Sequence, residues 1–505
     1  MKPAITAIAI VFLFCSHATA QQKLTLLQQQ EDFKIFKTSV QEIHAGAYWF
    51  ITPEKFNTLY DSVFATIKDN EDAEQFYLKI RFCMAALHHG HDGVQLTNQQ
   101  PGLNYKMGAM PVDRKHLPFV LEYLGEKLFI LNNCSSNKQI TNGSEVVSIN
   151  GKTIKSLNKQ MLQYIFANGR NTTYKYKMLG FYFQFHYLYQ LLYPTETTYK
   201  IGIIPYQSKK KTDILVKAEL PQTIAYRYQQ RTGKSINDWD TLFTYKLLNK
   251  KKAIGYCKME TFSTQRFDTD SIKLAKVLEK MFAQIKADNI KSLVVDVRNN
   301  EGGDDSWQTA ITYFRPIEEN TNDGLAYLQS DKFTYLQYII QTDENRPLLQ
   351  AFQYTPYALI DKTPEGRFKL KPEYTAHDTK AKTQMPNAFT GDVYLLQNGL
   401  TFSAGFAFAG RLKERIKASN GFIKIIGEDN GDDMDAGVGS GGWGIELLLP
   451  NSKVKLNIPV TGSGEKAYTL PPVHFLDYKV LPSISDKLKG IDTELVFAIK
   501  MISAK

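Results

Sequence analysis

Three stretches at the start of the chain carry apolar residues at the spacing of amphipathic helices. They cover residues 33–43, 56–67 and 76–87, with polar residues on the positions between. Thr52 stands directly before Pro53, and this order is typical of a capping residue followed by the first helical position. The pattern therefore predicts a helical N-terminal domain.

From about 103 to 215 the pattern changes to short strands. Residues 140–151 form a short apolar strand that ends in Asn150-Gly151, which favours a hairpin turn, and residues 157–166 have the pattern of a helix. This order of strand, turn and helix is similar to a PDZ module, which binds an extended peptide along a sheet edge. Another kind of small β-domain fits the same pattern.

From about 240 onward the pattern alternates between strands and helices. The strands are continuous apolar runs and the helices have one apolar face, which is typical of a buried, partly parallel sheet. Between about 317 and 386 the sequence turns polar, and we expect an irregular insertion there. The predicted strands cover 253–259, 292–297, 393–397 and 422–426, and the predicted helices cover 271–287 and 403–413.

The N-terminus has the pattern of a secretion signal. Lys2 precedes a short apolar run, and Ala18-Thr19-Ala20 gives the small-x-small cleavage pattern, so we expect the mature chain to begin at Gln21. No later apolar run is long enough for a membrane helix. The sequence therefore predicts a secreted or periplasmic protein. The alternative is a buried first helix.

The amino-acid composition excludes few further classes of protein function. The 505 residues are 43% hydrophobic and carry a net charge of +10, without a long basic block, so nucleic-acid binding is not expected. Three cysteines follow the signal, and an odd number permits at most one internal disulfide or three buried thiols. They are Cys83, Cys134 and Cys257.

Two strand ends carry candidate chemistry. The predicted strand over residues 292–297 leads into Gly302-Gly303, whose uncovered amides could stabilise an oxyanion or could simply form a turn. A second strand leads to Ser403 at the first turn of a helix, followed by the small residue Ala404. Free amides and the helix dipole favour a developing alkoxide there. An ordinary capping serine is the alternative.

These two segments resemble the paired signatures of the tail-specific, or C-terminal-processing, serine peptidases, a family that includes the tricorn core protease and the interphotoreceptor retinoid-binding repeats. Residues 296–303 match its Asp-x-Arg-x-Asn-x-Gly-Gly pattern and residues 401–404 match Thr-x-Ser-Ala. The resemblance extends over nearly the whole mature chain. It implies an α/β catalytic domain with a mixed sheet and helices, of the ClpP/crotonase-like kind, preceded by a helical domain and a PDZ-like β-rich module.

The same resemblance implies the domain boundaries. A signal peptide covers 1–20, a helical N-terminal domain covers 21–100, and a PDZ-like module covers 101–215. The catalytic domain covers 216–505, with the insertion at about 317–386.

The chain departs from the family at the catalytic base. Many members use a lysine that follows a Gly-Glu-x-Thr-x-Gly pattern, but residues 427–433 contain no lysine. The tricorn branch instead uses a histidine from the N-terminal domain and a late glutamate. His91 and Glu465 match these two residues by position, although Pro472 stands where the family usually has aspartate. The alternatives are that His91 stabilises a turn and that Glu465 is a surface carboxylate.

The resemblance thus implies an exported serine endopeptidase that hydrolyses extended or unfolded polypeptides through an acyl-enzyme at Ser403. His91 is the expected base and Glu465 the carboxylate that orients it, while the amides of Gly303 or Gly302 and of Ala404 form the oxyanion hole. No cofactor or metal is expected. The alternative is a catalytically inactive protein that binds peptides or lipids on the same fold. Cleavage preference and oligomeric state stay open.

Overall fold

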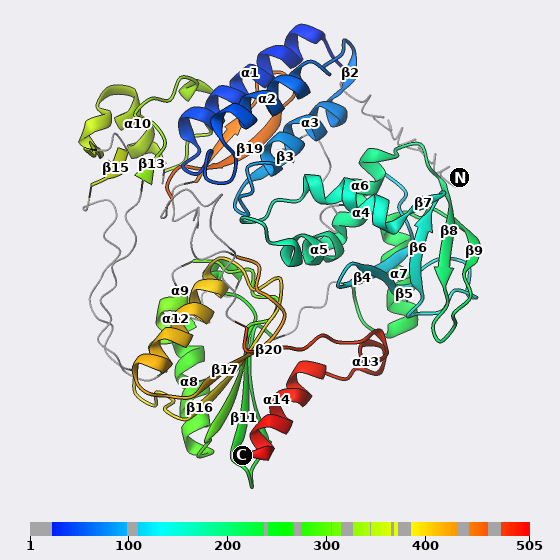
Figure 1. The fold of residues 1–505 in the computed structure, drawn as a ribbon, viewed down its shortest axis with the longest axis vertical. Helices are drawn as coiled ribbons and strands as arrows, with labels where there is room; N and C mark the ends of the chain where they lie inside the picture. Colours follow the sequence, from blue (N-terminus) through cyan, green and yellow to red (C-terminus); the bar gives the residue numbers. More distant parts are fainter. Residues whose placement is uncertain are drawn as a thin grey trace, which may run out of the picture.

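The structure is a computed structural model. It describes residues 23–97, 110–236, 241–266, 274–304, 306–314, 327–343, 345–364, 368–371, 385–432, 444–462 and 476–505. The predicted signal peptide and Glu465 lie outside these residues. Figure 1 shows three groups of elements: helices at the top, a β-rich unit at the right, and a sheet flanked by helices below.

The predicted N-terminal helices are present. They are α1 (Leu26–Ile43), α2 (Pro53–Phe64) and α3 (Ala73–Ala85). Thr25 and Thr52 cap the first two by accepting hydrogen bonds from backbone amides of the first turn. The apolar faces of all three helices pack into one core, and we call this group the helical unit.

Segments from the second half of the chain complete the helical unit. Strand β3 (Gly93–Leu96) pairs with β19 (Val454–Pro459), which pairs with β18 (Gly444–Leu448), all antiparallel. Helix α10 (Arg346–Tyr354) buries its apolar face in the same core. The predicted irregular insertion is therefore partly regular, and its described part includes the small sheet β13 (Tyr327–Leu328), β15 (Phe368–Leu370) and β14 (Ile360–Lys362).

The β-rich unit covers the second stretch. Its strands are β4 (Phe119–Leu124), β5 (Lys127–Asn133), β6 (Glu145–Ile149), β7 (Lys152–Thr153), β8 (Thr198–Ile204) and β9 (Thr212–Lys217). Its helices are α4 (Ile154–Met161), α5 (Thr172–Gly180), α6 (Gln184–Leu192) and α7 (Pro221–Thr232). Ile149 pairs with Lys152 across Asn150-Gly151, so the predicted hairpin is confirmed.

The third group is a mixed six-stranded sheet in the order β10-β11-β12-β16-β17-β20. Strand β10 is antiparallel to β11, and the other neighbouring pairs are parallel, so the predicted partly parallel sheet is confirmed. The strands are β10 (Phe243–Asn249), β11 (Ile254–Met259), β12 (Ser292–Asp296), β16 (Asp392–Gln397), β17 (Ile423–Gly427) and β20 (Tyr478–Lys479).

Both faces of this sheet are covered, which explains its continuous apolar strands. Leu293 and Val295 pack towards α8 (Leu274–Ala287) and α12 (Ala404–Ala418), whereas Val294 belongs to a core with α14 (Thr493–Ala504). Figure 1 shows α8, α9 (Ser306–Ile311) and α12 on one side of the sheet and α14 on the other.

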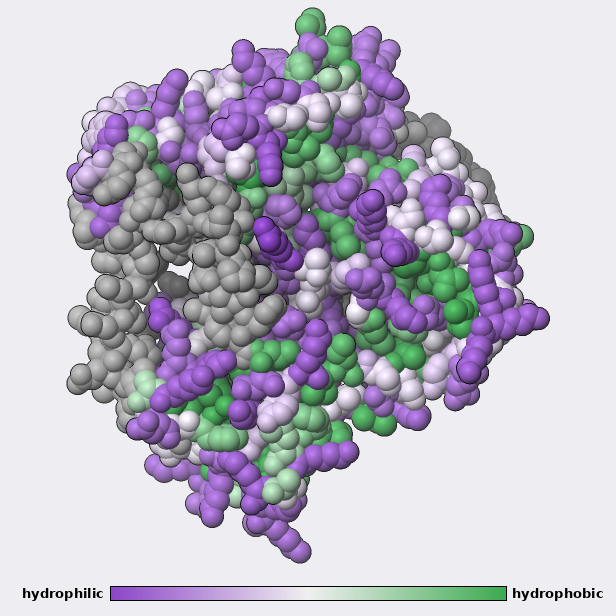
Figure 2. Space-filling model, in the orientation of Figure 1, coloured by the Kyte–Doolittle hydropathy of each residue, from purple (hydrophilic) through white to green (hydrophobic). Residues whose placement is uncertain are grey.

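The outer surface is mostly hydrophilic on the face drawn in Figure 2, with smaller hydrophobic areas between. Among the described residues, no helix combines the length and apolar character needed to cross a membrane. Cys83, Cys134 and Cys257 are all buried and unpaired, as the odd count permitted.

Candidate active site

Ser403 lies at the junction between the loop after β16 and helix α12. Its backbone angles are φ 52° and ψ −123°, a conformation that costs a non-glycine residue about 1–3 kcal/mol. The side chain makes no capping hydrogen bond with the helix. Instead, its Oγ lies 3.0 Å from Nε2 of His91, which is 312 residues away in the sequence. The strained turn therefore presents the hydroxyl to the imidazole.

The loop that carries Ser403 is held by the segment after β12. Thr401 Oγ1 donates to the carbonyl oxygen of Val297 at 2.9 Å, and the Phe402 amide donates to that of Asn300 at 3.0 Å. A side chain on Gly405 would begin 2.3 Å from the same Asn300 oxygen, so only glycine fits this approach. The two motifs identified in the sequence therefore form one packed structure.

Asn300 also fixes the double glycine. Its Oδ1 accepts the amide of Gly302 at 2.9 Å, and its Nδ2 donates to the carbonyl oxygen of Met259 at 3.0 Å. A Cβ on Gly302 would lie 2.8 Å from the amide nitrogen of Ala404, which places the glycine turn against the start of α12. Within the part of the chain that the structure describes, neither Gly303 nor Ala404 donates its amide to an acceptor.

The turn that carries His91 rests on a buried histidine–aspartate pair. His44 Nδ1 accepts the Gly46 amide at 3.0 Å, so its proton is on Nε2, which donates to Oδ1 of Asp92 at 2.8 Å. His89 Nε2 donates to the Gly46 carbonyl oxygen at 2.7 Å. Asn457 of β19 donates to the carbonyl oxygen of His91 at 2.9 Å. The histidine turn is thus fixed from both sides.

Burial keeps this pair uncharged near neutral pH. Desolvation lowers the pKa of His44 to about 3, in agreement with an Nδ1 that accepts a hydrogen bond. Desolvation also raises the pKa of Asp92 to about 8, and nearby His89 and His91 oppose this shift. Although the two side chains lie at ion-pair distance, we describe them as a hydrogen bond between neutral groups.

The structure separates the remaining candidates. Gly302, Gly303 and Ala404 lie together beside Ser403, whereas Glu465 is outside the described residues. Lys424 of β17, the lysine that comes shortly before residues 427–433, forms an ion pair with Asp477 at 3.2 Å.

Sequence reasoning missed two residues at the site. They are Asn168, which donates to Asp432, and Asp432 itself, which accepts the Ser403 amide at 3.0 Å. No motif marks Asn168. Asp432 lies within residues 427–433, which stood out in the sequence only for the absence of a lysine.

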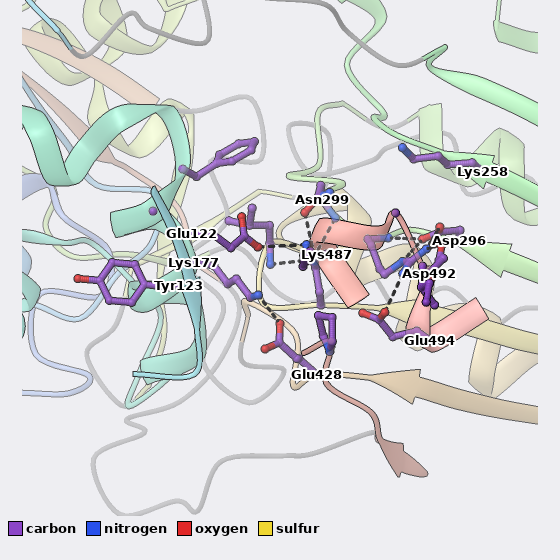
Figure 3. Close-up of a pocket in the computed structure, with 18 residues that line it drawn as sticks. Glu122, Tyr123, Lys177, Lys258, Asp296, Asn299, Glu428, Lys487, Asp492 and Glu494 are labelled. Carbon is purple, nitrogen blue, oxygen red and sulfur yellow. Dashed lines mark hydrogen bonds and ion pairs between the residues drawn. The ribbon is translucent and has the colours of Figure 1, made fainter. Parts of the chain in front are cut away.

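A charged cavity of about 380 Å³ lies next to the segments that hold the loop carrying Ser403, between α5 and the ends of β12 and β16. Figure 3 shows Lys177 turned towards Glu428, and the two form an ion pair at 2.9 Å. Lys487 pairs with Glu122 at 3.1 Å, and Arg298 pairs with carboxylates that include Asp296 at 2.6 Å. The charges are matched within the wall, and this arrangement favours a structural ion network over a substrate site.

Comparison with known families identifies the sheet and its loops. Residues 253–434, which include Ser403 and the double glycine, match the model of "Peptidase family S41". These residues form an S41 peptidase domain. The chain therefore contains a serine-type peptidase domain of family S41, as the two motifs indicated. His91 lies outside the matched segment and reaches the S41 domain from the helical unit.

Solved structures share the fold over almost the whole chain. Mature CPAF complexed with lactacystin is 13% identical, with a TM-score of 0.61 over 95% of this chain and 98% of that chain. A second structure of mature CPAF is 12% identical, with the same TM-score and coverage. At such low identity the likeness shows the fold alone. No curated protein matches the chain.

Proposed function

We propose that this chain is an exported serine endopeptidase that cleaves extended or unfolded polypeptides through an acyl-enzyme at Ser403. The observation that carries the proposal is the 3.0 Å separation between Ser403 Oγ and His91 Nε2 at a strained turn of an S41 domain. A serine hydroxyl needs a base before it attacks a carbonyl, and neutral imidazole titrates near working pH. His91 then takes the proton and returns it to the leaving amine.

The oxyanion of the tetrahedral intermediate is bound by the amides of Gly303 and Ala404. The amide of Gly302 is already donated to Asn300, so we assign Gly302 the separate role of bringing the turn against α12. A preorganised donor of this kind typically contributes about 10² to 10³ in rate. Glu465 remains our candidate for the carboxylate that orients His91.

The domain organisation belongs to the same proposal. A signal peptide over residues 1–20 directs export, the helical domain begins at Gln21, and the β-rich unit acts as a PDZ-like module that presents a polypeptide end. The catalytic domain, which contains the S41 match, follows from residue 216. Pairing between β3 and β19 attaches the strand next to His91 to the second half of the chain, so segments of that half complete the helical unit.

The test is hydrolysis of casein by the purified mature chain and by Ser403→Ala. The wild type should degrade casein, and the variant should be inactive while its melting temperature changes little, because the side chain makes no capping bond. Casein hydrolysis that survives the substitution would exclude Ser403 as the nucleophile. An inactive wild type would favour the alternative function, a binding protein on the same fold.

A further inference from the structure

A hydrogen-bonded link connects the turn that carries His91 with the backbone of Ser403. The Gly90 amide donates to Oδ1 of Asn168 at 2.5 Å. Asn168 Nδ2 donates to Oδ1 of Asp432, and the other oxygen of Asp432 accepts the Ser403 amide at 3.0 Å. The link therefore ends one residue before His91 and on Ser403 itself.

The three members of the link come from three different parts of the fold. Asn168 belongs to the loop that precedes α5, and Figure 1 draws α5 between the helical unit and the S41 sheet. Gly169 also donates its amide to the His88 carbonyl oxygen at 2.9 Å. Asn171 Nδ2 donates to the Asn430 carbonyl oxygen at 2.6 Å. One loop of the β-rich unit thus binds both the histidine turn and the loop that follows β17.

We propose that Asn168 and Asp432 are positioning residues that set the distance between His91 and Ser403, and this proposal rests on the proposed peptidase function. Neither side chain needs to touch substrate. Each end of the link is a backbone N–H that requires an acceptor oxygen, and the middle requires one donor and one acceptor. A displacement of about 1 Å between reacting groups is enough to cost about 10²-fold in rate.

The link makes a specific prediction because asparagine and aspartate have the same shape. In Asp432→Asn the new amide cannot satisfy both of its partners: either its nitrogen faces the Asn168 nitrogen, or the Ser403 amide loses its acceptor. In Asn168→Asp two carboxylates face each other. In the double variant Asn168→Asp/Asp432→Asn all three hydrogen bonds can form again, with only the middle one reversed in direction. The total charge is also that of the wild type.

The experiment measures kcat, KM and the rate of labelling by a fluorophosphonate in the wild type, both single variants and the double variant. We expect each single variant to lose about 10- to 100-fold in kcat with KM changed less than about twofold. We expect the double variant to recover most of the loss. Asp429→Asn is the matched control, because it removes a carboxylate of the same loop that pairs with Lys479 at 3.6 Å, and it should retain wild-type kcat.

Single variants with wild-type kcat, or a double variant no better than the singles, would overturn the proposal. If the wild type neither hydrolyses peptides nor reacts with the fluorophosphonate, the proposed function fails separately. The crystal structure of Asp432→Asn then decides the link by itself. A separation between His91 Nε2 and Ser403 Oγ that stays at 3.0 Å would contradict it, and a longer one would support it.

Discussion

The imidazole of His91 lies against the ring of Phe402, with ring centroids 4.7 Å apart and planes inclined by 33°. On its other flank, Phe402 packs against Tyr174 at 4.8 Å. Gly90 leaves room for this arrangement, since a Cβ there would lie 2.6 Å from the end of the Phe402 ring. Phe402, the residue before Ser403, therefore supports the proposed base.

Phe402→Leu tests this contact. The smaller side chain removes the ring beside His91, so we expect kcat/KM to fall about tenfold, through a displacement of well under 1 Å. The matched control is Phe408→Leu, which changes a buried ring of α12 that packs on Phe262 and Phe314. Both variants should lose similar stability in thermal unfolding. Equal loss of kcat/KM in both would mean that the contact with His91 has no special role.

The double glycine gives a second prediction. A Cβ on Gly303 would lie 2.1 Å from the Ser263 amide nitrogen, and the residue has φ of 145°, so even alanine must displace the turn. We expect Gly303→Ala to lower kcat by about 10²-fold or more and to lower the melting temperature as well. Kinetics and calorimetry on the same sample check this. Unchanged kcat would exclude the Gly303 amide from the oxyanion hole.

The chain's two functional motifs were predictable because each lies within a continuous segment. Residues 294–303 and 401–404 fixed the positions of β12, the glycine turn, Ser403 and the start of α12. The contacts that could not be predicted join residues that are far apart in the sequence. The contact between β3 and β19 joins residues more than 350 positions apart, and Asn168 reaches Asp432 through the docking of a loop. Such contacts leave no local pattern of apolar and polar residues.

We expect the buried histidines to make the folded chain less stable in acid. Desolvation lowers their pKa values to about 3 or 4, below the usual value of about 6.5 in the unfolded chain. Their contribution to the free energy of unfolding is therefore complete above about pH 6.5 and is lost as pH falls below that value. The five residues are His44, His88, His89, His116 and His186.

We expect the urea midpoint to fall clearly between pH 7 and pH 5. In His186→Gln the amide can replace the imidazole as donor to the Phe119 carbonyl oxygen, so the midpoint should fall less over the same interval. Unfolding curves of both proteins at the two pH values provide the measurement. An equal fall in the variant would show that His186 does not contribute to the acid sensitivity.

Asp92 changes the stability of the folded chain with pH in the opposite direction to the histidines. Burial raises its pKa to about 8, so the folded chain holds a proton that the unfolded chain has lost, and stability falls as pH rises from about 4 to about 8. Asp92→Asn removes this dependence and keeps an oxygen for the His44 Nε2 proton. As pH is raised from 5 to 9, Asp92→Asn should therefore become more stable relative to the wild type. Thermal unfolding at pH 5 and pH 9 measures this difference. If Asp92→Asn loses stability relative to the wild type over this interval, Asp92 and His44 do not form a pair of neutral groups.

The most direct test of the account is the pH dependence of fluorophosphonate labelling at Ser403, with the adduct located by peptide mass spectrometry. We expect an adduct on Ser403, with a labelling rate that rises through an apparent pKa of about 6 to 7, the usual range for a histidine base. His91→Ala should label at least about 10²-fold more slowly and without this rise. Labelling at another residue, or an unchanged rate in His91→Ala, would contradict the account.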